Sequence, residues 1–86
     1  MQEEKRQIVI NSLAKTIKRL RGDKSQYNLG LEYGIPSSVI NNIEHGEKDP
    51  QYTTIFRIAN ALNLTFSEFA KELEKELPEN FNWYDD

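Results

Sequence analysis

Residues 25–46, SQYNLGLEYGIPSSVINNIEHG, decide the fold of this chain of 86 residues. Ser25 can accept a hydrogen bond from a free amide at a helix start, and Gly30 lets a second helix cross closely. Gly34 suits a turn that needs a positive φ, and Gly46 supplies a second stop. After Gly34, apolar side chains fall on one helical face and short polar ones on the other, with Ile35, Ile40 and Ile43 set against Ser37, Ser38, Asn41 and Asn42. The stretch predicts two helices of about three turns joined by a glycine turn, which is a helix-turn-helix.

The flanking sequence predicts three further helices and no strand. Apolar residues at three- and four-residue steps predict a first helix over 6–21. Another is predicted over 50–62, with Asp49 as its cap and Pro50 in its first position. A last helix over 65–77 opens with Thr-Phe-Ser-Glu, which has capping-box spacing. The expected fold is all-α, with five helices and the helix-turn-helix formed by the second and third.

The composition indicates one small domain rather than an enzyme. The chain has 37% hydrophobic residues, one histidine and no cysteine. This inventory supplies no catalytic nucleophile, metal-ligand set or general base, so we expect no catalysis, no metal and no cofactor. No apolar run approaches the ~18 residues of a membrane span, and we expect a cytoplasmic protein without a membrane partner. Residues 1–77 are expected to form the domain, and residues 78–86 an acidic aromatic tail.

Taken together, these residues resemble the phage repressor and Cro-like family, known as the XRE family of helix-turn-helix transcription regulators. The matching positions are Ser25-Gln26, Leu29, Gly30, Gly34-Ile35, Ile40, Ile43-Glu44, Gly46, Asp49-Pro50, Ile55, Ile58-Ala59, Leu62 and Leu64-Thr65. They extend over roughly residues 13–70, which makes the signal much stronger than a lone glycine pattern. The resemblance implies a repressor-like domain that binds double-stranded DNA sequence-specifically and reads the major groove with residues 36–45.

Residues at the DNA surface can be assigned from the same geometry. The expected base contacts are Ser37, Ser38, Asn41 and Asn42. Asn42 is the favoured base reader, because an asparagine amide can bond N6 and N7 of adenine together. The expected phosphate contacts are Gln26, Lys18, Lys24, His45 and Lys48. Of these, Gln26 is carried over from the role that the family gives to the start of its second helix, which is a contact to phosphate or to a base edge.

The net charge of −3 is unevenly distributed along the chain. Residues 1–24 carry a net charge of +4, residues 25–64 one of −2 and residues 65–86 one of −5. A positive stripe that could meet phosphates comprises Lys15, Lys18, Arg19, Arg21 and Lys24. The acidic C-terminal part is expected to face away from DNA.

The chain departs from the family pattern in three places. Pro36 starts the recognition helix, where it removes an amide that could bind phosphate. The recognition helix has no Arg or Lys, so guanine readout by a bidentate Arg is not available from it. The connection from Arg21 to Ser25 is shorter than usual, so two arginines compete for one family role: in relatives an Arg on the first helix pairs with the Glu that ends the third. Hydrophobic phase favours Arg21 with Glu44 as this structural ion pair, and Arg19 is the alternative to Arg21.

The C-terminal aromatic residues suggest a second surface. With a core already available in the first four helices, leftover aromatics favour a homodimer interface, which would use Phe66, Phe69, Leu73 and Trp83. An alternative interface lies on the first helix through Ile8 and Val9. A two-fold dimer would present two recognition helices to a palindromic operator.

A rival hypothesis is a protein-interaction module, antitoxin-like or an adaptor, with weak or no DNA binding. It would use the surface of Tyr27, Leu31 and Tyr33 or the C-terminal aromatics to bind a protein partner. The acidic total charge and the uncharged recognition helix favour it, whereas Gln26, the polar recognition face and the basic first helix oppose it. Phage repressor, restriction-modification controller and antitoxin all use this module, so the sequence leaves the choice between them open.

Overall fold

The computed structural model describes residues 2–84, and every regular element in that range is helical. The elements are α1 (Gln2–Arg21), α2 (Gln26–Gly30), a 3₁₀ turn η1 (Leu31–Tyr33), α3 (Ser37–Glu44), α4 (Tyr52–Ala61) and α5 (Phe66–Glu76). The prediction of an all-α, five-helix domain is confirmed. Residue 1 and residues 85–86, at the outer ends of the predicted domain and tail, lie outside the described residues.

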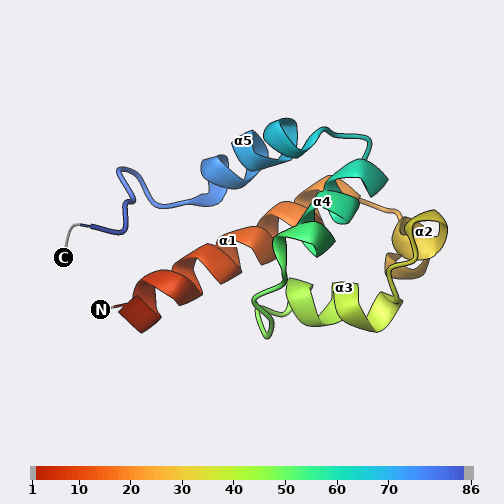
Figure 1. The fold of residues 1–86 in the computed structure, drawn as a ribbon, viewed down its shortest axis with the longest axis horizontal. Helices are drawn as coiled ribbons and strands as arrows, with labels where there is room; N and C mark the ends of the chain where they lie inside the picture. The colour runs from red at the N-terminus through yellow and green to blue at the C-terminus, as the bar shows by residue number, and fades with distance from the viewer. Residues whose placement is uncertain (1, 85–86) are drawn as a thin grey trace.

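Helix α1 runs through the middle of the molecule, and α3 and α5 pack on different sides of it (Figure 1). Helix α4 packs against both α2 and α5. The acidic α5 therefore lies across α1 from α3. The tail after α5 returns to the start of α1, where Lys5 Nζ donates to the Trp83 carbonyl at 3.0 Å and the Trp83 indole donates to the Gln2 side chain.

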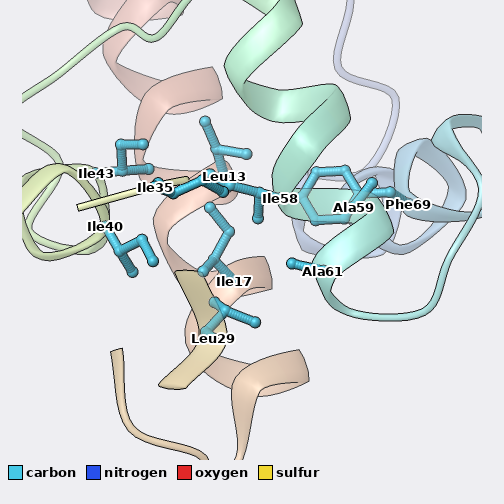
Figure 2. Packing of buried hydrophobic residues seen from close by; sticks show 10 residues of the cluster. All are labelled: Leu13, Ile17, Leu29, Ile35, Ile40, Ile43, Ile58, Ala59, Ala61 and Phe69. Atoms are coloured by element: carbon cyan, nitrogen blue, oxygen red, sulfur yellow. The ribbon is translucent and has the colours of Figure 1, made fainter. Parts of the chain in front are cut away.

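One hydrophobic core joins all five α-helices, and Figure 2 shows its side chains converging between α1, α3 and α4. Ile17, Ile40 and Ile58 are fully buried at its centre. Each such side chain contributes about 1.5–3 kcal/mol of transfer free energy. Phe69 is 1% exposed and also belongs to this core. Its predicted place in a dimer interface is therefore wrong, because α5 uses Phe69 to close the domain.

The corner between α2 and α3 depends on two glycines. A Cβ on Gly30 would lie 2.0 Å from the carbonyl oxygen of Ile35, so the predicted close approach is made by the backbone that follows the turn. Gly34 has φ +67°, in the left-handed region that favours glycine. The prediction of three-turn helices is wrong here. Helix α2 has five residues and tightens into η1, and α3 has eight, because Gly34 and Gly46 bound the segments closely.

Several helix starts differ from those predicted. Helix α1 begins at Gln2 rather than near residue 6, and its first turn carries Glu3 and Glu4, which favour the positive helix end. Helix α4 has Gln51 as its N-cap, because the carboxylate of Asp49 bonds Arg6 of α1 at 3.2 Å instead of capping.

Pro36 is not the first residue of α3. It is the N-cap, with ψ 143°, and its carbonyl accepts the first intrahelical bonds. A cap with extended backbone suits proline, whose φ is fixed.

The predicted capping box at α5 is confirmed. Thr65 Oγ1 accepts from Glu68 N at 3.1 Å, and Glu68 Oε1 accepts from Thr65 N at 2.8 Å. Asn63, which follows the last turn of α4, has φ 65°. The amide of Leu64 bonds Ala59 O there at 2.9 Å, the pattern of a Schellman end.

Candidate nucleic-acid interface

Helix α3 presents a short polar surface to solvent. Ser37, Ser38 and Asn41 are exposed, whereas Ile40 and Ile43 on the opposite face are at most 1% exposed. Asn42 is half-buried, whereas the other three predicted base contacts are exposed. It lines a shallow groove of about 170 Å³ between α3 and the loop before α4, together with Val39, Ile43, Lys48, Asp49, Pro50 and Thr54. Of the four, Asn42 therefore has the most restricted approach to a partner.

An ion pair fixes the end of α3 to α1. Arg21 Nε and Nη2 each lie 2.7 Å from one carboxylate oxygen of Glu44, and Arg21 Nη1 donates to Lys24 O at 2.8 Å. The Glu44 side chain is 1% exposed. Burial acts to raise the pKa of Glu44, but the hydrogen bonds from Arg21 and Gln26 outweigh it, so that pKa lies below its ordinary value. This is the pairing that hydrophobic phase favoured.

Arg19, the alternative partner, lies on another face of α1. Its Nη1 donates to Glu72 Oε1 and its Nε to Glu76 Oε2, both at 2.8 Å. The hydrogen bond from Arg19, helped by Lys75, lowers the pKa of Glu72. Arg19 thus neutralises acid on α5, and it is removed from the positive stripe expected along α1.

Gln26 bridges α2 and α3. Its Nε2 lies 3.1 Å from Glu44 Oε1 and 3.4 Å from Asn41 Oδ1. Both side-chain N–H groups therefore point to acceptors within the protein. A phosphate contact by this side chain would have to break one of these bonds, so its expected role shifts toward holding α3.

Three of the basic candidates, Lys18, His45 and Lys48, lie near the second half of α3, whereas Lys24 lies beside η1 and the end of α4. Lys18 is exposed, and its charge lies close enough to Glu44 to lower the pKa of that carboxyl. This contribution is smaller than those of burial and the hydrogen bonds. Lys24 is exposed beside Arg21, and no salt bridge within residues 2–84 involves Lys18 or Lys24. His45 is the C-cap of α3, with Nδ1 2.7 Å from Asn41 O, so Nδ1 carries the hydrogen and Nε2 is left to face outward. Lys48 is exposed at the groove beside Asn42.

The four predicted dimer residues do not form one surface. Phe69 is in the core, and Leu73 is half-buried against it. Phe66, at the start of α5, stacks on Phe56 of α4 with ring centroids 5.2 Å apart, whereas Trp83 lies beside the start of α1. Ile8 and Val9, the alternative interface, are also half-buried.

Sequence reasoning missed an apolar patch on α4. Tyr52 is 71% exposed and Phe56 46% exposed, and Phe66 extends the patch onto α5. The four-residue spacing of Tyr52 and Phe56 was the available signal, because residues four apart share a helix face.

The fold and the site together define a helix-turn-helix domain. The sequence model of a helix-turn-helix family matches residues 17–69, from the last turn of α1 through α2, α3 and α4 into α5. The chain belongs to this family of Cro/XRE-like regulators, whose members are DNA-binding domains. No curated protein and no solved structure matches the chain. No helix among residues 2–84 has the length and apolar character to cross a membrane.

Proposed function

We propose that this chain is a sequence-specific DNA-binding regulator that acts as a transcriptional repressor and reads the major groove with residues 36–45. The observation that carries the proposal is the outer face of α3, where Ser37, Ser38 and Asn41 are exposed while the opposite face is buried in the core. A helix whose exposed face carries only short polar side chains can lie deep in the major groove. The hydroxyl and amide groups of those side chains can then bond base edges.

The distribution of charge supports an orientation in which α3 faces the DNA and α5 faces away from it. Lys18, Lys24 and Lys48 form no salt bridge within residues 2–84, so their charges are available to phosphates beside the groove. The acidic residues of α5 lie across α1, and Arg19 neutralises part of them. The net charge of −3 therefore does not oppose DNA binding at α3.

The experiment is selection of DNA from a random pool by the purified chain at about physiological salt, at which specific binding exceeds non-specific binding by about 10³-fold or more. We expect enrichment of a palindrome, since two-fold paired readers require one. Ser38→Glu should abolish binding by placing a carboxylate against the DNA. Ser67→Glu is the matched control, because Ser67 is exposed on α5 and its replacement should leave binding intact. A pool without enrichment would overturn the proposal.

A second candidate function is binding to a protein partner, and one observation favours it. Tyr27 and Leu31 are 63% and 57% exposed, and they border an open apolar groove of about 480 Å³ at the helix-turn-helix corner. Large exposed apolar side chains beside a groove are typical of protein-binding surfaces. If the random pool gives no enrichment, capture of a partner that Leu31→Ser no longer binds would support this function instead.

A further inference from the structure

A chain of hydrogen bonds with a defined direction runs from α1 to the outer face of α3. It begins at Arg21, whose guanidinium has donors only and stays protonated. Both oxygens of Glu44 accept from it, at 2.7 Å each. The carboxylate of Glu44 can therefore act only as an acceptor toward its other neighbours.

This requirement orients the amide of Gln26. An amide has a donor end and an acceptor end, and only the donor end can face a carboxylate. Gln26 Nε2 faces Glu44 Oε1 at 3.1 Å, and the second hydrogen on the same nitrogen points to Asn41 Oδ1 at 3.4 Å. Asn41 is thereby oriented in turn, with its oxygen toward the protein. Its Nδ2 donates to no atom of residues 2–84 and belongs to an exposed side chain.

An asparagine oriented in this way is not an adenine reader. Bidentate bonding to adenine needs Oδ1 to accept from N6 while Nδ2 donates to N7. With Oδ1 held by Gln26, Asn41 offers DNA two N–H donors. Guanine presents two adjacent acceptors, N7 and O6, in the major groove. Adenine could bond Asn41 fully only by displacing Gln26, which would leave an N–H group of Gln26 without its partner at a desolvated surface.

We propose that Asn41 is a specificity residue that selects guanine over adenine at one base pair of each half-site, and that Gln26 is the positioning residue that sets this preference. The proposal rests on the proposed DNA-binding function. It supplies guanine readout to a recognition helix that has no Arg or Lys.

The test in DNA begins from the operator found by random-pool selection. Asn41→Ala identifies the base pair concerned as the one whose preference it removes. At that pair the wild type should bind G·C about tenfold more tightly than A·T, at the low end of the discrimination expected for one good base contact. Gln26→Met removes the donor but keeps the length of the side chain, so it should free Asn41 Oδ1 and shift the preference at the same pair toward A·T. Gln2→Met, at the N-terminal end of α1, is the matched control and should leave every base preference unchanged.

Two results would overturn the proposal while leaving DNA binding established. One is an A·T preference at the Asn41 pair in the wild type. The other is a Gln26→Met variant that loses affinity equally for all sequences, because that outcome makes Gln26 a purely structural residue.

A measurement without DNA tests the orientation itself. In the free protein, both side-chain N–H groups of Gln26 are bonded, whereas those of Asn41 face solvent. The Gln26 amide hydrogens should therefore exchange with water more slowly than those of Asn41 in NMR of the ¹⁵N-labelled protein. Equal exchange rates would contradict the orientation, whether or not an operator is found.

Discussion

Glu44 is a buried carboxylate whose charge is matched mainly by one side chain, Arg21. Arg21→Met would leave that charge without its partner, and breaking a buried pair in this way costs about 3–5 kcal/mol. Arg19→Met is the matched control on the same helix, because Arg19 is 40% exposed and solvent screens its ion pairs with α5, so it should lose much less stability. Urea unfolding of the two variants measures both values. Similar losses would show that the Arg21 pair has no special role in stability.

The pH dependence of stability follows from the same carboxyl group. The folded-state pKa of Glu44 lies below its ordinary value of 4.5, so its contribution is fully present above about pH 4.5 and is lost as pH falls through the folded pKa. The free energy of unfolding should decrease in that acid range. In Arg21→Met, burial of Glu44 is no longer offset by the guanidinium, and the acid-dependent loss should become smaller. If the free energy of unfolding decreased equally in acid for both proteins, the decrease would come from other carboxyl groups.

Lys18 should act through phosphate without reading sequence. Lys18→Gln is expected to lower affinity for all DNA sequences alike and to reduce the slope of log K against log salt by about 0.9. Lys71→Gln, which removes an exposed charge on α5, should leave the slope unchanged. Titrations at several salt concentrations measure this, and a change in base preference at Lys18→Gln would argue against a phosphate role.

At the level of elements, two glycine substitutions separate a steric loss of stability from a conformational one. Gly30 lies at the corner between α2 and α3, and Gly22 follows α1. Gly30→Ala would place a methyl group 2.0 Å from Ile35 O, although the φ of Gly30, −88°, is acceptable for alanine. Such overpacking typically costs about 1–3 kcal/mol and should also displace α3, so DNA affinity should fall with stability. Gly22→Ala meets no atom within 4 Å but retains φ +58°, so it should lose only stability, by about 1–2 kcal/mol. If Gly30→Ala kept full affinity, the corner would not position α3.

At the level of the whole molecule, exposed aromatics lie at the helix-turn-helix corner, on α4 and α5, and in the C-terminal tail, and we expect a homodimer to use Tyr52, Phe56 and Phe66. Trp83 already bonds Gln2 and makes a T-shaped contact with Phe81, which leaves it less free to pair. Tyr52→Asp should therefore shift the sedimentation mass toward the monomer and weaken binding to a full operator.

A chain that ends after Leu77 serves as the comparison and should remain dimeric. If the shortened chain were instead monomeric and Tyr52→Asp remained dimeric, the interface would lie in the tail. Leu73→Asp is unsuitable as a test of pairing because Leu73 packs against the core, and a charge there would unfold the domain.

Local sequence determined the helix-turn-helix because the relevant signals act within a few residues. Ser25 caps α2, Gly34 takes a positive φ, and the 3.6-residue period separates the buried and exposed faces of α3. The family resemblance implied that an Arg of α1 pairs with Glu44, and hydrophobic phase favoured Arg21 over Arg19 for this role.

Only the tertiary structure decided which side chains meet across elements. Asp49 bonds Arg6 rather than capping α4, Phe69 enters the core, and Gln26 turns its amide toward Asn41. Periodicity says which face of a helix is apolar, but not which helix will cover it or how many polar groups lie within reach. Those outcomes depend on how helices cross and how side chains fill the space between them, and this information is distributed over the whole chain.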